Sequence, residues 1–204
     1  MAREKRASFR DETYWGRPLP GFGDPRGRVL VVGLAPAAHG GNRAGRIFTG
    51  DRSGDWLYRA LYRAGFASQP ESVSRNDGLR IRDCFITAAV RCAPPANKPT
   101  PQEFATCFSW LAAEFALLAR VRVVVALGSL AWRQALALQA ARGVAIPSPR
   151  PRFGHGVEVV LRDGLTVLAS YHPSQRNTFT GTLTEPMFDA LWERVRTLLA
   201  SSDV

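Results

Sequence analysis

The sequence has few cysteines, almost no lysine and no long apolar run, and each shortage excludes a class of protein. Among 204 residues only Cys84, Cys92 and Cys107 are cysteines, too few and too odd in number for a secreted disulfide scaffold. No stretch approaches the roughly 20 consecutive apolar residues that a transmembrane helix needs. The charged opening Met1–Arg6 lacks the apolar core of a signal peptide. We therefore expect a soluble cytoplasmic protein that contacts no membrane.

Lysine is nearly absent from a chain that is strongly basic. Lys5 and Lys98 are the only lysines among 27 basic residues, and with 17 acidic residues the formal net charge is +10. The planar guanidinium of arginine suits phosphate better than an ammonium does, so this excess favours a polyanionic partner. A coding sequence rich in G and C, which favours arginine throughout, explains the same composition without any partner.

Length and composition predict a single domain over residues 1–204. The chain is 46% apolar and 22% charged, which is typical of a folded globular protein and excludes wholesale disorder. A chain of this length buries one core and leaves no room for a second enzyme domain. Residues 1–27 carry turn-forming prolines and glycines with little periodicity, so we expect them to form an irregular N-terminal arm.

Strands alternate with helices along the rest of the chain, which predicts an α/β fold with a mainly parallel sheet between helical layers. Helices are indicated by apolar residues at helical spacing, by a capping box at Thr100–Glu103 and by Ser129 as a second cap. The predicted strands are 29–32, 84–92, 121–127 and a hairpin of 157–161 with 165–170. The predicted helices begin near 56, at 101, at 129 and near 186. Core positions in these helices are expected for Trp56, Trp110, Trp132 and Trp192.

Two long polar loops follow predicted strands, at the edge of a parallel sheet where ligands bind. The first, residues 33–51, is rich in glycine, which lets its backbone approach a ligand closely. The second, residues 172–181, contains Gln175, Arg176 and Asn177, whose amides and guanidinium are groups that read bases and phosphates. Because long loops in compact domains usually serve function, we expect the site to lie between these two.

The first loop lacks the motifs of nucleotide-binding proteins. It has no Gly-Lys-Ser/Thr ending of a phosphate-binding P-loop, which argues against nucleoside triphosphate hydrolysis. It also lacks a Gly-x-Gly-x-x-Gly run that opens a helix, which argues against a dinucleotide site. We therefore expect no nucleotide cofactor.

Four segments together resemble the signature motifs of one enzyme family. They are Gly33-Leu34-Ala35-Pro36-Ala37, Arg46-Ile47-Phe48-Thr49-Gly50-Asp51, the run Ala88–Pro99, and His172-Pro173-Ser174. In this order they resemble the uracil-DNA glycosylase superfamily, in its family-five (type B) branch. The resemblance implies a three-layer α/β/α sandwich around a four-stranded, mainly parallel sheet. It also implies DNA as the partner and removal of uracil, and of other deaminated or damaged bases such as hypoxanthine, leaving an abasic site for base-excision repair.

The resemblance implies chemical roles for three residues. Breaking the N-glycosidic bond builds positive charge on the sugar and negative charge on the departing base. His172 is the candidate hydrogen-bond donor to the pyrimidine oxygen at C2. Residues 34–37 have no side chain that can hold the attacking water, so that role is expected to pass to Asp51. Asn97 is expected to contact the base or its water.

A base inside the duplex must first be flipped out, and the resemblance implies the pocket that receives it. Phe48 is the expected stacking platform, and Gln175 and Arg176 are candidate wedges that enter the minor groove. Alanines at positions 88 and 89, where some relatives carry a base-reading asparagine, predict a broad substrate range. The candidate pocket residues are Gly33, Leu34, Ala35, His39, Asn42 and Phe48, and the candidate DNA-binding residues are Ser174, Gln175, Arg176 and Asn177.

Each main candidate also has an ordinary structural role as an alternative. Asp51 is placed to cap the helix that begins near Ser53. His172 is placed to hold its loop, Phe48 to anchor the first loop in the core, and Asn97 to form a turn before a proline. The sequence leaves these alternatives open.

Members of the family-five branch usually carry a 4Fe–4S cluster on four cysteines. Two of these metal ligands fall where Cys92 and Cys107 stand, and we expect those two thiols to lie close together. The Cys-x-x-Cys pair that supplies the other two is missing, either because this sequence starts too late or because the cluster is lost. Cys84 lies in a predicted buried strand. Because two thiolates cannot hold a cubane, we expect no intact cluster on this chain.

Two other functions remain open from the sequence. A hydrolase of free nucleosides or nucleotides needs the same base pocket but no groove-entering loop, and its substrate binding is less sensitive to salt than DNA binding is. A damage-binding module without catalysis binds the lesion and releases no base. In each case we expect a monomer.

Overall fold

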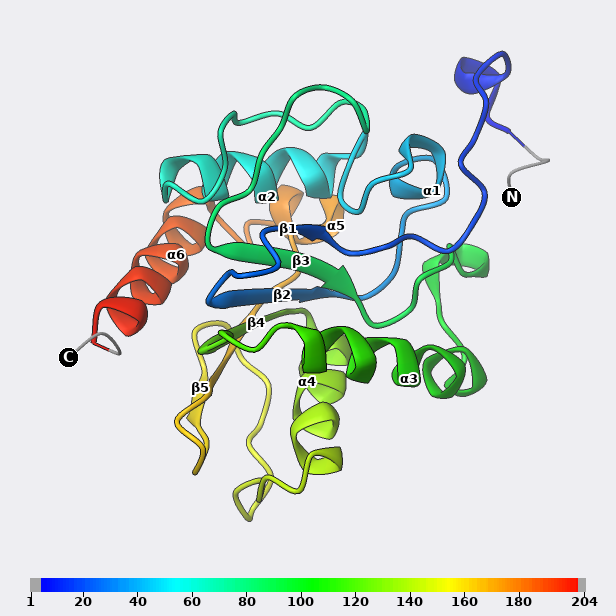
Figure 1. The fold of residues 1–204 in the computed structure, drawn as a ribbon. Coiled ribbons are helices and arrows are strands. Elements are labelled where there is room, and N and C mark those ends of the chain that lie inside the picture. The colour runs from blue at the N-terminus through cyan, green and yellow to red at the C-terminus, as the bar shows by residue number, and fades with distance from the viewer. Residues whose placement is uncertain (1–4, 202–204) are drawn as a thin grey trace.

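The computed structural model describes residues 5–201 and shows one sheet between two layers of helices (Figure 1). The strands are β1 (Phe22–Gly23), β2 (Val29–Gly33), β3 (Cys84–Ala88), β4 (Val123–Leu127), β5 (Glu158–Val160) and β6 (Thr166–Ser170). Their order in the sheet is β1-β3-β2-β4-β6-β5. The four inner strands are parallel and the outer two pair antiparallel. The predicted sandwich is confirmed, and short strands at both edges raise the strand number from four to six.

The helices cover the two faces of the sheet. They are α1 (Gly41–Ala44), α2 (Arg52–Arg63), α3 (Pro101–Leu117), α4 (Ser129–Ala141), α5 (Gln175–Phe179) and α6 (Glu185–Ala200). In Figure 1, α2 and α6 lie on one face and α3 and α4 on the other. Short 3₁₀ helices at Ala7–Phe9 and Pro95–Asn97 complete the elements of the described residues.

Each inner strand is buried on both faces because its side chains alternate between two cores. On β2, Val29 and Val31 pack toward α2 and α6, and Leu30 and Val32 pack toward α3 and α4. All four side chains are almost fully buried. Because the four inner strands are parallel, their carboxyl ends lie at one common edge of the sheet, where the loops that follow them meet.

Capping residues explain where two of the long helices begin. The predicted capping box is confirmed: the Thr100 hydroxyl accepts from the Glu103 N–H, and the Glu103 carboxylate accepts from the Thr100 N–H. The Thr184 hydroxyl caps α6. The prediction of Ser129 as a cap is wrong, because Gly128, at φ +93°, makes the turn from β4 and leaves Ser129 as the first helical residue.

Two further predictions are wrong. Residues 89–92 are not part of β3, which ends at Ala88. Trp110 is 64% exposed, because α3 turns Leu111 and Phe115 toward the sheet and Trp110 toward solvent. Trp132 and Trp192 are buried as predicted.

The N-terminal arm is partly ordered by the body of the protein. The Gly16 N–H donates to the Asn42 carbonyl, and the Leu19 N–H to the Arg91 carbonyl. Tyr14 and Leu19 are buried, and β1 joins the edge of the sheet. Residues 1–4 of the predicted arm lie outside the described residues. No helix within residues 5–201 combines the length and hydropathy needed to cross a membrane.

Candidate functional site

A cavity of about 200 Å³ lies at the carboxyl edge of the sheet, between the two loops singled out in the sequence. The first loop follows β2, the second follows β6, and the segment after β3 closes a third side. This volume is smaller than a typical drug-sized pocket, so the cavity suits a single planar ring. It is lined by Leu34, Ala35, Ala37, Ile47, Phe48, Asp51, Ser53, Asn97, His172 and Ser174.

Asp51 caps a helix and faces the cavity at the same time. Its Oδ1 atom accepts from the Gly54 N–H at 3.0 Å, which makes Asp51 the N-cap of α2. Burial raises the pKa of its carboxyl above the ordinary 3.8, although the Gly54 hydrogen bond acts in the opposite direction. The structural alternative and the predicted role are therefore compatible, because one carboxylate has two oxygens.

The Asp51 carboxylate fits its position only because residue 40 has no side chain. A Cβ atom on Gly40 would lie 2.1 Å from Asp51 Oδ2 and 2.8 Å from its Cβ and Cγ atoms. Such distances are far inside van der Waals contact, so any side chain here must displace the carboxylate. Gly40 thus sets the position of Asp51 in the cavity.

Phe48 combines a core position with a place in the cavity wall. It is 6% exposed and belongs to the core beneath α2 and α6. Its backbone has φ +52°, which is costly for a residue with a Cβ. A Cβ on Gly33 would lie 2.8 Å from the Phe48 ring, so Gly33 makes room for the ring and lies outside the cavity lining.

His172 stands where β6 ends, across the cavity from the first loop. Its ring centroid is 6.0 Å from that of Phe48. Burial lowers the pKa of His172 to about 4, so its imidazole is neutral at neutral pH and one ring nitrogen carries a proton to donate. The Asn177 side-chain amide donates to the His172 carbonyl at 2.9 Å and holds the backbone in place.

A second histidine, to which no role was assigned from the sequence, supports the same strand end. His155 Nδ1 accepts from the Tyr171 N–H at 3.2 Å, and its Nε2 lies 3.1 Å from the Met187 carbonyl. These two contacts place the ring proton on Nε2, since Nδ1 acts as the acceptor. His155 therefore anchors the residue that precedes His172.

Asn97 lies at the end of a 3₁₀ turn and lines the cavity. Ala96 and Asn97 both have positive φ, at +52° and +55°. Asparagine tolerates this conformation better than most residues, which agrees with its alternative role in a turn. The turn is also what brings Asn97 to the cavity, so neither role excludes the other.

Besides Gly33, two other predicted pocket residues lie outside the cavity lining. The His39 Nδ1 atom forms a hydrogen bond of 2.8 Å with the Tyr14 hydroxyl of the N-terminal arm. Asn42 is buried, and its amide donates to the Ala38 carbonyl. Both are used in holding the first loop and lie outside the cavity lining. Ala37, Ile47 and Ser53, which the sequence did not single out, line it instead.

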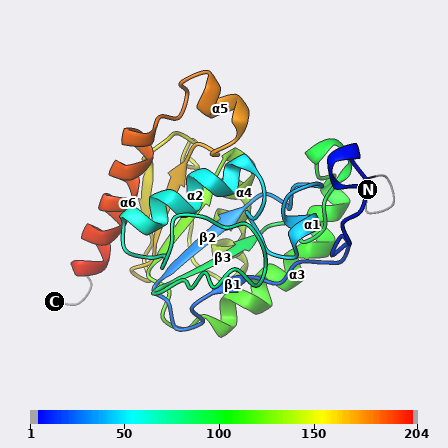
Figure 2. The same ribbon diagram turned by 90° about the horizontal axis from the view of Figure 1, so that it is seen from above.

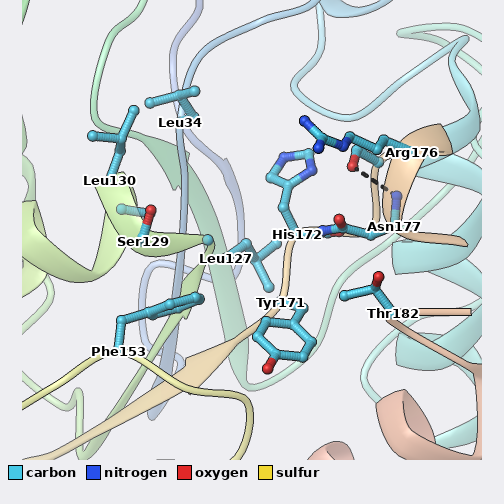
Figure 3. A pocket seen from close by; sticks show the side chains of 13 residues that line it. Leu34, Leu127, Ser129, Leu130, Phe153, Tyr171, His172, Arg176, Asn177 and Thr182 are labelled. Atoms are coloured by element: carbon cyan, nitrogen blue, oxygen red, sulfur yellow. Dashed lines mark hydrogen bonds between the residues drawn. The ribbon is translucent and has the colours of Figure 1, made fainter. Parts of the chain in front are cut away.

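A larger cavity of about 570 Å³ adjoins the first and shares Leu34, His172 and Ser174 with it. Figure 3 shows the His172 ring beside Arg176, with Phe153 and Tyr171 below them in that view. This cavity is open to solvent along the loop that follows β6.

The loop that follows β6 folds into the short helix α5, which projects beyond the helical layer in Figure 2. The Ser174 hydroxyl caps it by accepting from the Asn177 N–H. Gln175 and Arg176 are exposed, as expected of groups that reach a partner. Phe179 is 68% exposed, with the Arg52 guanidinium 5.0 Å from its ring.

The cysteines of this chain do not fit a four-thiolate cluster. Burial first, and then neighbouring Cys107 and Glu103, raise the pKa of the Cys92 thiol, so the two thiols interact. Cys84 is fully buried in β3, within the core under α2 and α6. Within residues 5–201, no three His, Cys, Asp or Glu side chains are grouped so as to hold a metal ion.

Comparison with known proteins decides the family. The family model described as the uracil DNA glycosylase superfamily matches residues 20–196. The chain belongs to the uracil DNA glycosylase superfamily. The superfamily match contains every residue that lines the 200 Å³ cavity and leaves out most of the N-terminal arm.

Three similar proteins of this superfamily are described as type-5 uracil-DNA glycosylases. The protein of Mycobacterium tuberculosis is 55% identical over 199 residues, covering 97% of this chain and 73% of its own length. That of Thermus thermophilus is 52% identical over 184 residues, covering 90% and 81%. That of Pyrobaculum aerophilum is 54% identical over 172 residues, covering 84% and 72%.

Proposed function

We propose that this protein is a uracil-DNA glycosylase of the type-5 group, which hydrolyses the bond between uracil and deoxyribose and starts base-excision repair. The observation that carries the proposal is one small cavity whose wall includes Asp51, Asn97 and His172. The identity to type-5 relatives over most of the chain supports the same activity.

The size of the cavity requires the target nucleotide to leave the helix. About 200 Å³ accepts one base and excludes a base pair, so the base enters only after rotating out of the stack. The adjoining cavity gives the attached sugar and phosphate a path along the β6 loop. Phe48 then serves as a surface against which the flipped base lies.

In the proposed reaction, Asp51 and His172 act on opposite ends of the breaking bond. Electron density moves from the sugar to the base, and the neutral imidazole of His172 donates to the base oxygen on which negative charge develops. The Asp51 carboxylate stabilises the cationic sugar and orients a water molecule toward its C1′ atom. The water adds to the sugar, Asp51 accepts its proton, and the released base is protonated in turn.

We further propose that the pocket accepts hypoxanthine as well as uracil. Much of the wall that faces the base is aliphatic, from Leu34, Ala35, Ala37 and Ile47. Apart from His172, the amide of Asn97 is the main group able to read a base edge. A pocket with few fixed donors and acceptors discriminates weakly between bases. Release of hypoxanthine from a duplex in which it lies opposite thymine tests this, and complete inactivity would contradict it.

The loop that follows β6 is the proposed contact with the duplex. Gln175 and Arg176 are exposed on α5, where an amide and a guanidinium reach the groove or the phosphates. Phe179 presents an apolar ring at the same helix, next to Arg52, which directly follows Asp51. We propose that Phe179 occupies the space that the flipped base leaves, as apolar wedges do in other complexes.

Three further expectations complete the proposal. This chain works without an intact iron–sulfur cluster, since it supplies three cysteines of which one is in the core. Anaerobically purified protein then lacks the visible absorption of such a cluster. We also propose a monomer in the cytoplasm, where thiols such as Cys92 stay reduced. Sedimentation analysis tests the first of these two points and cell fractionation the second.

The decisive test of function is base release from a labelled duplex with one uracil, followed by alkaline cleavage of abasic sites. We expect cleavage of the uracil strand and none of a thymine control. Binding to the duplex should weaken steeply with salt, because arginine contacts release counterions from DNA.

The same assay separates the two competing functions. A nucleoside hydrolase would release uracil from free deoxyuridine at a rate comparable to that from the duplex, with little dependence on salt. A damage-binding module would retain the uracil duplex without cleaving it. Either outcome would overturn the proposed glycosylase activity.

A further inference from the structure

A buried polar network lies behind the segment that carries Phe48 and Asp51, outside the cavity itself. At its centre is Arg46, which is 4% exposed. Its Nε atom donates to the Thr49 hydroxyl at 3.0 Å, and its Nη2 atom donates to the Ser72 hydroxyl and to the Asp77 carboxylate, each at 2.6 Å. The guanidinium also lies 4.8 Å from the Phe22 ring.

Apart from Thr49, the partners of Arg46 come from a segment that does not line the cavity. Residues 67–81 leave α2 and return to β3, and a bridge between Ala67 and Ile81 closes this excursion. The Ser72 hydroxyl lies 2.7 Å from the Thr49 hydroxyl, and the Ser72 carbonyl accepts from the Gly50 N–H at 3.1 Å. The excursion therefore holds the first loop directly before Asp51.

Several hydrogen bonds hold the Asp77 carboxylate in this network as an anion. Burial disfavours its charge, but hydrogen bonds from Arg46 and from the N–H groups of Leu79, Ser74 and Val73 outweigh that effect and lower the pKa of Asp77 to about 2. A buried ion pair of this kind contributes little net stability compared with an apolar replacement. The role of the Arg46–Asp77 pair therefore lies in the conformation that it imposes on the neighbouring segment.

The segment held by the network contains a residue with an unfavourable backbone conformation. Phe48 lies between Arg46 and Thr49 and has the unfavourable φ of +52°. Such a conformation is unfavourable for a residue with a Cβ atom and persists only where the surroundings determine it. Arg46 and Thr49 bond to each other across Phe48, and the Tyr58 hydroxyl donates to the Ile47 carbonyl at 2.8 Å.

We infer that the buried Arg46–Asp77 pair, with Ser72 and Thr49, is a positioning unit that sets the Phe48–Asp51 segment for the base-release step and takes no part in binding DNA. The inference rests on the proposed function, because it concerns which residues set the rate of the proposed uracil release. Arg46 and Asp77 lie outside the cavity lining, so they act through Phe48 and Asp51.

The test compares Arg46→Lys, which keeps the charge but loses the fork of donors, with Ser72→Ala, which removes one hydroxyl. Arg28→Lys is the matched control, because Arg28 pairs with Asp83 at 2.6 Å at the opposite end of β2. Single-turnover base release is measured at saturating enzyme, and affinity is measured on a duplex carrying a non-hydrolysable abasic analogue. Melting temperatures confirm that each variant is folded.

We expect Arg46→Lys to slow base release by about 10- to 100-fold, as a shift of about 1 Å at reacting groups does, with unchanged affinity for the analogue duplex. Ser72→Ala should act in the same direction and Arg28→Lys should leave the rate unchanged. In an Asp51→Asn background the effect of Arg46→Lys should shrink, because coupled residues are not additive.

Two results would overturn the inference. One is a wild-type rate for both Arg46→Lys and Ser72→Ala while Asp51→Asn is slow. The other is an Arg46→Lys effect of the same size with and without the Asp51 carboxylate. A wild-type rate for Asp51→Asn itself would instead refute the proposed role of Asp51, so the two failures are distinguishable.

Discussion

Replacing Gly40 with alanine tests the position of Asp51 without altering Asp51 or any group that touches the substrate. The added methyl carbon would lie 2.1 Å from Asp51 Oδ2, whereas ordinary contact begins at 3.4 Å. The close approach to the Asp51 Cβ and Cγ atoms, at 2.8 Å, means that rotation of the carboxylate alone does not relieve the overlap. The whole side chain must retreat by about 1 Å, a shift that costs roughly 100-fold in rate when it affects a reacting group.

The assay for Gly40→Ala is single-turnover release of uracil from a duplex, with enzyme in excess. We expect a loss of about 100-fold in the rate of base release and little change in affinity for duplex DNA, because Gly40 is buried. Thr184→Ala is the control for lost stability, since it removes the cap of α6 at a cost of about 1 kcal/mol and Thr184 does not line the 200 Å³ cavity. A Gly40→Ala rate equal to that of Thr184→Ala would refute the reasoning.

Three other predictions concern the remaining parts of the site. His172→Ala should slow base release by about 100- to 1000-fold at unchanged duplex affinity, which is the usual effect of removing one hydrogen-bond donor to a developing anion. A rate equal to that of the wild type would exclude His172 as that donor. The rate of base release should rise with pH through the Asp51 pKa, which lies above 3.8, and level off toward neutral pH. The reason is that the Asp51 carboxylate must be ionised, while His172, with a pKa of about 4, is neutral in that range. A rate plateau that extends below pH 3.8 would contradict this. Phe179→Ala should slow release from duplex much more than from single-stranded DNA, since only a duplex has a gap to fill, and an equal effect on both would exclude Phe179 as the wedge.

Much of the architecture could be predicted from local patterns in the sequence. Val29–Gly33 is a continuous apolar strand because it is buried on both faces, and that pattern needs no knowledge of its partners. The start of α3 was also predictable, because a capping box uses residues three apart in the chain. The edge strand β5 was predicted as one half of a hairpin, but the edge strand β1 was not, since it has two residues and owes its existence to β3.

The site residues were predictable where one residue faces the cavity from a strand end or a nearby loop. His172 and Asp51 follow recognisable segments, and the structure places both in one cavity wall. His39 and Asn42 lie in the same loop, but the His39 ring bonds to Tyr14 of the N-terminal arm, a contact between segments far apart in the sequence, and the Asn42 amide bonds back to Ala38. Trp110 was misassigned for a related reason, because α3 is apolar around much of its surface and periodicity did not reveal its exposed face.

The most direct test of the central claim is the rate of uracil release by Asp51→Asn. Asparagine keeps an oxygen that can cap α2 through Gly54, so the variant removes the negative charge and leaves the helix start intact. We predict a loss of about 100- to 10,000-fold in single-turnover rate, with duplex affinity and melting temperature near those of the wild type. A variant that releases uracil at the wild-type rate would show that the cavity works without the Asp51 carboxylate and would contradict the proposed mechanism.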